Sequence, residues 1–353
     1  MGEVLPIRTA RLTVRMMTPA RDAEVLAAYR NDPAVAKHQL WDLPYSVEDA
    51  RKMLDGQTAD DQLVPGGKYQ LAIEVDGVVV GDVFTAIDET GGTAEIGFTL
   101  ATAHQGCGYA SEAAGAVVAA LFDQLGCVRV YGELDPENTA SQRVLERIGL
   151  IHEATTKQSF LWRGEWTDNM SYAATRSEYD EWRHRPTAPP GDVQLVELDW
   201  RTERTYRHLR THHSQERFVD PTWLSIVEAH FPEEIDGAPV VPWMRGIDAD
   251  GQPAGFLMIA EVTEHHPEPY LWRLLIDRLH QRRGIAGRAL RLLFERLRAE
   301  GHATLITSWG EGPGSPRPFY ERLGFVPTGE VVDGETEARL ELTADGASRA
   351  GAQ

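Results

Sequence analysis

The sequence predicts an α/β protein made of two tandem copies of one domain, each a mixed, mostly antiparallel sheet flanked by helices. The main observation is a repeated loop, because residues 105–110 read Gln-Gly-Cys-Gly-Tyr-Ala and residues 281–286 read Gln-Arg-Arg-Gly-Ile-Ala. Each loop lies between a strand-like and a helix-like run, and each is followed at nearly equal spacing by a hydrophobic-Gly-hydrophobic ending at Gly149 or Gly324. Matched flanks and spacing indicate duplication, and a chain of 353 residues has room for two cores.

The first copy begins with a strand at 12–16 and a helix at 20–29. Strands at 69–75 and 78–85 flank Asp76-Gly77, and a two-residue Asp-Gly between strand-like runs is a strong hairpin signal. The remaining predicted elements are a strand at 94–100, a helix at 111–125, a strand at 128–133, a helix at 140–147, and strands at 155–163 and 169–175.

The segment His-Arg-Pro-Thr-Ala-Pro-Pro-Gly at 184–191 predicts a linker, because its prolines and glycine propagate neither helix nor central strand. We therefore expect an N-terminal domain over 1–183, a C-terminal domain over 192–344 and a disordered tail over 345–353. The second copy is predicted to contain strands at 193–197, 243–247, 255–260, 270–276, 304–308 and 339–342, and helices at 202–211, 288–299 and 318–323.

Composition narrows the class of protein. A net charge of −19 disfavours non-specific binding to nucleic acid, and it is compatible with either simple solubility or a cationic amine substrate. We expect no membrane span and no secretory signal. Cys107 and Cys127 form neither a disulfide framework nor a zinc motif, so we expect a cytoplasmic protein without a metal.

The two loops predict an anion site. A glycine-bearing turn that opens a helix directs several backbone N–H groups to one point, and the helix N-terminus adds partial positive charge. Such a nest suits a diphosphate. The glycine spacing fits neither a dinucleotide fingerprint nor a Walker loop. A single such loop is as readily an ordinary helix start, whereas the matched pair favours binding.

These residues resemble the GCN5-related N-acetyltransferase (GNAT) superfamily, once in each half. The first half is similar to the ribosomal-protein-alanine acetyltransferase branch, through residues 95–98, 108–113, 138–141 and 166–168. The second half is similar to the bacterial spermine/spermidine (diamine) acetyltransferase branch. Its matches are residues 213–219, 273–277, 329–330 and 333–335.

The resemblance implies that acetyl-coenzyme A (acetyl-CoA) is the acyl donor, with its pyrophosphate on the loop and its pantetheine arm in a gap beside the preceding, splayed strand. It implies transfer of the acetyl group to a small-molecule amine or a peptide N-terminus. The expected cofactor-binding residues are Leu100, Gln105, Gly106, Cys107, Gly108, Tyr109, Ala110 and Asn138 in the first half, and Ile276, Gln281, Arg282, Arg283, Gly284, Ile285 and Ala286 in the second.

Acetyl transfer to an amine needs a base, a donor for the carbonyl oxygen and an acid for the departing thiolate. The resemblance assigns the acid role to Tyr320, whose alternative is a ring packed under the sheet. The first half has Leu145 there, so Ser141 is its candidate acid; the alternative role of Ser141 is a helix N-cap. Glu95 is its candidate base or a solvent-facing strand carboxylate.

The base of the second half stays open among Glu261, Glu264, Glu330 and Glu335. The second half also has Pro313 where the first has Asn138. Because each copy departs from the pattern, two functions remain: an N-acetyltransferase, with the C-terminal half slightly favoured as catalytic, or a partly degenerate acyl-CoA-binding scaffold. We expect a monomer whose halves form an internal pseudo-dimer.

Overall fold

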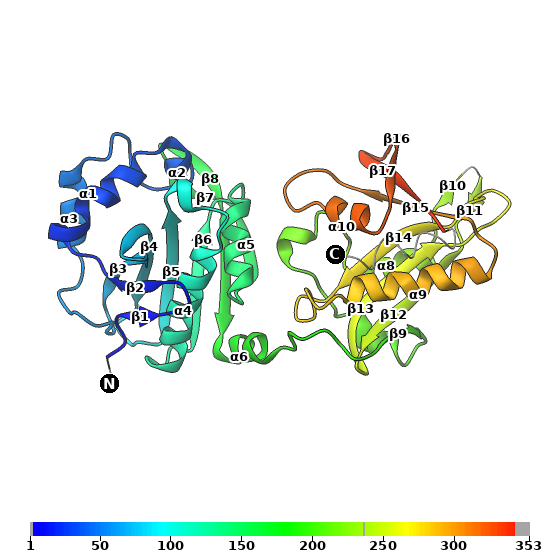
Figure 1. The fold of residues 1–353 in the computed structure, drawn as a ribbon, viewed down its shortest axis with the longest axis horizontal. Helices are drawn as coiled ribbons and strands as arrows, with labels where there is room; N and C mark the ends of the chain where they lie inside the picture. Colours follow the sequence, from blue (N-terminus) through cyan, green and yellow to red (C-terminus); the bar gives the residue numbers. More distant parts are fainter. Residues whose placement is uncertain (1–2, 236, 343–353) are drawn as a thin grey trace. The chain divides into compact units, whose positions relative to one another are not determined.

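Two mixed β-sheets form the framework of the protein in a computed structural model, which describes residues 3–235 and 237–342 (Figure 1). One sheet belongs to the unit Met1–His184 and the other to the unit Arg185–Gln353. Helices flank each sheet, which confirms the predicted fold class. The expected tail at 345–353 lies outside the described residues.

The N-terminal unit contains an eight-stranded sheet in the order β1-β2-β3-β4-β5-β6-β8-β7. Its strands are β1 (Ile7–Arg8), β2 (Thr13–Met16), β3 (Lys68–Val75), β4 (Val78–Ile87), β5 (Thr93–Leu100), β6 (Arg129–Leu134), β7 (Ile151–Trp162) and β8 (Glu165–Thr175). Its α-helices are α1 (Pro19–Arg30), α2 (Pro33–Ala36), α3 (Val47–Asp55), α4 (Tyr109–Asp123), α5 (Thr139–Arg147) and α6 (Arg176–His184), with a short 3₁₀ helix, η1, at Thr102–His104.

The C-terminal unit contains a seven-stranded sheet in the order β16-β17-β15-β14-β13-β12-β9. Its strands are β9 (Val193–Glu197), β12 (Pro242–Ala249), β13 (Gln252–Ala260), β14 (Tyr270–Ile276), β15 (Thr304–Trp309), β16 (Val326–Val332) and β17 (Glu335–Glu341), with a separate hairpin of β10 (Glu234–Ile235) and β11 (Ala238–Pro239). Its helices are α7 (Glu203–Tyr206), η2 (His213–Gln215), α8 (Thr222–His230), α9 (Ile285–Ala299) and α10 (Arg317–Arg322).

Both large sheets contain one parallel pair, formed by the strand before the repeated loop. The pair β5/β6 runs from Thr93↔Arg129 to Glu95↔Tyr131. The pair β14/β15 comprises Tyr270↔Ile306 and Leu271↔Thr307. Beyond these pairs the described strands separate, while β5 and β14 stay paired with their antiparallel neighbours β4 and β13. Each sheet therefore opens towards the carboxyl end of the strand that leads into its loop.

The long helix after each loop covers one face of its sheet. In α9 the buried residues are Ile285, Ala289, Leu290, Leu293, Phe294 and Leu297. They recur at three- and four-residue steps, so they form one apolar stripe, and they pack in a core that includes Trp309 and Phe325. Each fully buried leucine of this stripe contributes roughly 1.5–3 kcal/mol. None of the helices in residues 3–235 and 237–342 combines the length and the apolar character that a membrane span needs.

Several elements differ from the sequence expectation. The structure adds α3, α6, α8 and β16, and the helix expected over 202–211 is limited to α7 at Glu203–Tyr206. Helix α3 begins at a capping box between Ser46 and Asp49. Its aspartate stands where the usual signature has Glu or Gln, and the segment before it is rich in Trp and Pro, so the helix signal was weak.

A glycine on the neighbouring strand lies opposite the end of each loop-bearing strand. Gly81 on β4 pairs with Leu100, and Gly255 on β13 pairs with Ile276. A Cβ on Gly255 would lie 2.4 Å from the carbonyl oxygen of Leu275, and one on Gly81 would lie 2.2 Å from that of Thr99. Both copies therefore need glycine for close backbone approach, which is a second sign of the duplication.

Gly255→Ala is expected to lower the free energy of unfolding of the C-terminal unit by about 1–3 kcal/mol, because the added methyl group displaces β14 backbone. Thermal or urea unfolding of the full chain measures this effect. The control is Gly287→Ala in α9, where a Cβ meets open space within the described chain. That change should leave stability unchanged or raise it. Equal stability of both variants would contradict the close approach.

Candidate functional site

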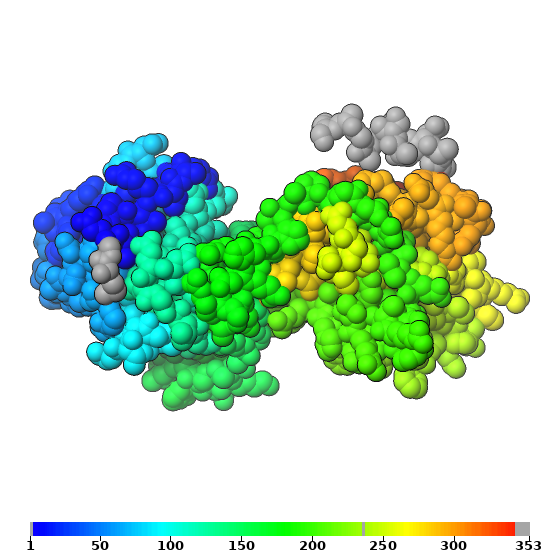
Figure 2. Space-filling view, turned by 90° about the horizontal axis from the view of Figure 1, so that it is seen from below, coloured from blue at the N-terminus to red at the C-terminus, as the bar shows by residue number. Residues whose placement is uncertain are grey.

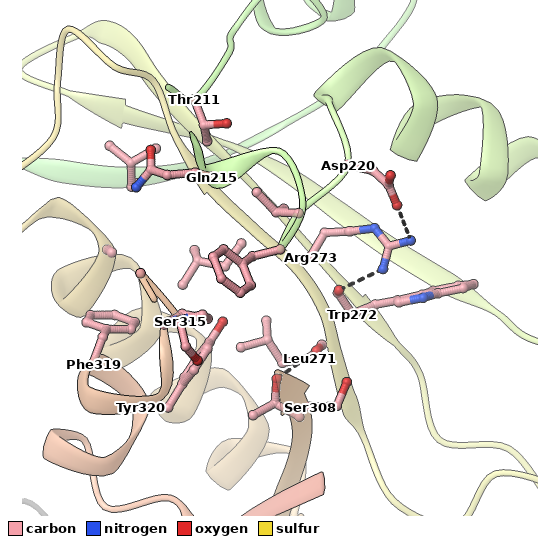
Figure 3. Close-up of a pocket in the computed structure, with 18 of the residues that line it drawn as sticks. Thr211, Gln215, Asp220, Leu271, Trp272, Arg273, Ser308, Ser315, Phe319 and Tyr320 are labelled. Carbon is pink, nitrogen blue, oxygen red and sulfur yellow. Dashed lines mark hydrogen bonds and ion pairs between the residues drawn. The ribbon is translucent and has the colours of Figure 1, made fainter. Parts of the chain in front are cut away.

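The described part of the C-terminal unit contains a cavity of about 860 Å³ at the opening between β14 and β15. Its walls come from β14, from the loop at residues 280–287, from β15 and α10, and from the segment 211–220 (Figure 3). That segment reaches the loop directly, because Gln281 Nε2 donates to Gln215 Oε1 at 2.8 Å. On the face seen in Figure 2, green residues near 200–230 border yellow to orange segments of the same unit. Residues far apart in the sequence thus enclose one space.

The loop forms an open turn at the start of α9. Gly284 is the N-cap residue, with φ +77° in the left-handed region, and Arg282 also has positive φ at 64°. In the described chain, a Cβ on Gly284 would have no atom within 4 Å, so the space before the helix is clear. Ile285, Ala286 and Gly287 follow along the cavity wall. Free amide groups at a helix N-terminus beside open space fit a diphosphate.

A β-bulge lies where the sheet opens. Met258 pairs with Arg273 and Ile259 pairs with Leu271, so the intervening Trp272 is the extra residue. The Leu271 carbonyl accepts from Thr307 Oγ1 at 3.1 Å, and the Trp272 carbonyl accepts from Arg273 Nη1 at 3.0 Å (Figure 3). The bulge turns β14 away from β15 and leaves its outer edge on the cavity.

Tyr320 reaches this cavity from α10. Its ring is buried, with 7% exposure, and stacks on Trp309 with centroids 5.7 Å apart and planes 10° apart. Phe325 meets the ring edge-on at 5.4 Å. Burial is the main reason that the pKa of Tyr320 lies well above its ordinary value. The phenol therefore keeps its proton at neutral pH, as a proton donor must. Tyr320 both packs its ring against the core and lines the cavity, so the two expected roles do not exclude each other.

The two loop arginines differ in position. Arg282 is exposed and lines the cavity. Arg283 is 5% exposed and is directed to the linker, where its Nε donates to the carbonyl of Ala188 at 2.7 Å. It also lies 3.5 Å from Asp250. The structure thus separates the two arginines expected to hold the coenzyme, because Arg282 lines the cavity whereas Arg283 contacts the linker backbone.

Arg282→Ala and Arg283→Ala are expected to separate affinity from stability. Loss of Arg282 should weaken coenzyme A binding several-fold, about 1 kcal/mol, without changing the unfolding transition. Loss of Arg283 should cost about 2 kcal/mol of stability, because buried polar partners lose their donor. Calorimetric titration and thermal unfolding of the full chain measure both quantities. A stable Arg283→Ala protein with selectively lost coenzyme binding would reverse the assignment.

The glutamine that opens each loop hydrogen-bonds to the last residue of the strand before it. Gln281 Nε2 donates to the carbonyl of Ile276 at 3.0 Å, and Gln105 Nε2 donates to that of Leu100 at 3.1 Å. These glutamines shape the turn through their side chains.

His280 was not predicted as a site residue. It lines the cavity and accepts from Arg283 at Nδ1, and its pKa is lowered, chiefly by burial. The signal was available, because His104 precedes the first loop in the same place.

The structure distinguishes the four carboxylates considered as base. Glu261 accepts from Arg296 at 2.7 Å, and Glu264 and Glu330 are exposed. Of the four, Glu335 belongs to the described cavity wall, where its carboxylate accepts from the hydroxyl of Ser308. The missing signal in the sequence was the pairing of β15 with β17, which brings these distant residues together.

The N-terminal loop has the same backbone form. Gly106 and Gly108 have φ of 78° and 81°, and Gly108 is the N-cap residue of α4, followed by Tyr109 and Ala110. The loop itself lacks a basic residue. Arg11, two residues before β2, reaches the loop and donates to the carbonyl of Cys107 at 3.0 Å. Arg11 also pairs with Glu112 at 2.6 Å, so its charge is offset by a carboxylate of the first helical turn.

The proposed acid and base of the N-terminal half occupy separate elements. Glu95 lies on β5 at the last parallel pair, and burial, followed by the nearby Glu133, raises its pKa. Asn138 caps α5 by accepting from the Ser141 N–H at 3.1 Å. Ser141 is thus the third helical residue, so the alternative that it caps the helix is wrong. Leu145, opposite Tyr320 in the repeat, is a buried core residue.

Comparisons with known proteins agree with this geometry in both halves. Residues 11–151 match the model described as the acetyltransferase (GNAT) domain, and residues 195–325 match the acetyltransferase (GNAT) family. An uncharacterized N-acetyltransferase of Bacillus licheniformis, p20, is 32% identical over 48% of this chain and 96% of its own length. A second, YnaD of Bacillus subtilis, is 27% identical over 49% of this chain and 99% of its own length.

Among solved structures, a GNAT-family acetyltransferase from Bacillus anthracis is 27% identical, with a TM-score of 0.44, over 48% of this chain and 98% of its own. The two family matches fall on either side of the linker, and each contains one glycine-bearing loop. The chain therefore belongs to the GNAT family of acetyltransferases and carries two such domains in tandem.

Proposed function

We propose that the protein transfers an acetyl group from acetyl-CoA to a primary amine, and that the C-terminal unit is the catalytic one. The observation that carries this proposal is the cavity shared by the open loop at the start of α9 and by buried Tyr320. The amide groups after Gly284 suit the diphosphate, and exposed Arg282 adds charge beside it. The loop and the tyrosine line the same cavity, which lies at the opening between β14 and β15.

In this proposal the neutral amine attacks the thioester carbonyl carbon directly. A C–N bond forms, the C–S bond breaks, and the leaving sulfur takes the proton of the Tyr320 hydroxyl. The unpaired edge of β14 beyond the bulge at Trp272 offers backbone N–H groups to the carbonyl oxygen as negative charge develops. The nitrogen then releases its extra proton, which restores the tyrosine through solvent.

A primary amine can accept the acetyl group, because its nitrogen is nucleophilic once it is deprotonated. The test uses the 353-residue chain with acetyl-CoA and a panel of spermidine, n-butylamine and tripeptides with free N-termini. Product is measured by mass, since Cys107 is exposed and free and would react with a thiol reagent. The expected result is amine-dependent acetylation that saturates with acetyl-CoA. Absence of product with every amine would reject the proposal.

A second candidate function applies to the N-terminal unit, which we propose binds acyl-CoA without fast transfer. The observation in its favour is Leu145, a buried aliphatic residue where the other unit has Tyr320. Its β4/β5 ladder also runs in register from Gly81↔Leu100 to Ile87↔Ala94, without the bulge of β14. Transfer that survives Tyr320→Phe and is then lost on adding Glu95→Gln would instead make the N-terminal unit an enzyme.

A further inference from the structure

Three polar side chains form a continuous chain along one wall of the cavity. The Tyr270 hydroxyl donates to Ser308 Oγ at 2.7 Å, and the Ser308 hydroxyl donates to a carboxylate oxygen of Glu335. The three residues lie on β14, β15 and β17, at the point where the sheet begins to open. All three are partly buried and line the cavity.

The direction of these hydrogen bonds is uniform. Each hydroxyl donates towards the carboxylate, so the phenolic oxygen of Tyr270 keeps lone pairs for a proton donor in the cavity. Burial is the main reason that the pKa of Tyr270 is raised, so its hydroxyl stays protonated and able to pass a proton on. A carboxylate at the end of such a chain can receive a proton that enters at the tyrosine.

The chain ends close to the proposed acid. Tyr270, Tyr320 and Glu335 all line the same cavity, and both Tyr270 and Glu335 act electrostatically on Tyr320. Figure 3 shows Tyr320 and Ser308 converging on this region from α10 and β15. An amine that attacks a thioester held there must first lose a proton, and Tyr320 already has the opposite task.

We infer that Tyr270, Ser308 and Glu335 form a proton relay that deprotonates the acceptor ammonium in the C-terminal unit. The inference rests on the proposed function. The ammonium gives a proton to Tyr270 Oη, Tyr270 gives its own to Ser308 Oγ, and Ser308 gives its own to Glu335. The ammonium becomes a neutral amine and the carboxylate becomes a carboxylic acid, which later releases the proton to solvent.

Other charged groups face this relay and influence it. Arg273 on β14 and Glu337 on β17 act on Tyr270, in opposite directions. Asp333, in the turn before β17, also lines the cavity. Glu311 accepts from Thr336, Trp309 and Arg317, so its carboxylate is directed to the β15–α10 loop. Glu335 is thus the carboxylate joined to the cavity by hydroxyl groups.

Glu335→Gln tests the relay in the full chain, because it keeps the side-chain size and removes the proton acceptor. With spermidine as acceptor, kcat/KM near neutral pH should fall by on the order of tenfold to hundredfold. The loss should shrink by about tenfold per pH unit as the pH approaches the amine pKa near 10, where neutral amine is supplied by solution. Coenzyme A affinity and thermal unfolding should stay unchanged.

Glu341→Gln is the matched control, since this carboxylate is exposed at the other end of the same strand and does not line the cavity. It should preserve the wild-type pH profile. Ser308→Ala should reproduce the profile of Glu335→Gln, and the double variant should be no slower than either single one. A pH-independent loss, or additive losses, would overturn the relay while acetylation itself persists. Lack of acetylation by the wild-type protein on every amine would overturn both proposals.

Discussion

Tyr320→Phe is expected to lower the rate of acetyl transfer at least about tenfold while leaving coenzyme A affinity unchanged. The substitution removes only the hydroxyl, and the ring keeps its stack on Trp309 and its edge contact with Phe325. The departing thiolate then lacks its proton donor, so kcat should fall and KM for acetyl-CoA should not. Steady-state kinetics and calorimetry on the full chain measure the two effects.

Tyr206→Phe provides the control for loss of a buried phenol in the same unit. Tyr206 is 3% exposed, and its hydroxyl donates to Asp248. This substitution should cost stability, because the aspartate loses a partner, and should leave kcat unchanged. If Tyr320→Phe and Tyr206→Phe both kept the wild-type rate, the tyrosine would be a packing residue and the acid would have to be sought elsewhere.

Gly284→Val is expected to abolish coenzyme A binding by the C-terminal unit. The backbone at Gly284 has φ +77°, which a β-branched residue reaches at a cost of roughly 1–2 kcal/mol. In addition, the new side chain would occupy the clear space in front of the first amide groups of α9. The strain lowers stability, whereas obstruction of the amide groups should lower coenzyme A affinity at least about tenfold. Acetylation at subsaturating acetyl-CoA should fall with it.

Two matched variants decide the origin of this effect. Gly301→Val introduces the same strain after the other end of α9, where φ is +89° and the described chain leaves a Cβ unobstructed, so it should cost stability but not affinity. Gly108→Val changes the corresponding N-cap of α4 and should leave acetylation intact. If Gly108→Val stopped the reaction and Gly284→Val did not, the N-terminal unit would be the enzyme.

The sequence was sufficient for what local signals encode. The glycine at each helix start, the Asp-Gly hairpin at 76–77 and the apolar stripe of α9 have short-range physical causes, and the structure contains each of them. The duplication could also be found, because spacing is conserved when whole elements are repeated. These features were enough to predict two mixed sheets and the loops that they carry.

Long-range contacts were harder to predict. Arg282 and Arg283 are adjacent in sequence, yet one lines the cavity and the other contacts the linker, which only the folded chain shows. Glu335 could not be ranked above other carboxylates until β17 was paired with β15. Only side-chain packing reveals that the Asn138 amide, and not the Ser141 hydroxyl, caps α5.

The anchored linker has a consequence for dissecting the protein into halves. Arg288 Nη2 donates to the carbonyl of Gly191 at 3.0 Å, and its Nη1 donates to that of Pro190, while Arg283 holds Ala188. A fragment begun at Asp192 would therefore remove backbone acceptors of two guanidinium groups that flank Gly284 of the cavity-lining loop. A fragment that starts at Arg185 keeps these acceptors. Activity assays on the separated C-terminal unit should therefore use a fragment that includes residues 185–191.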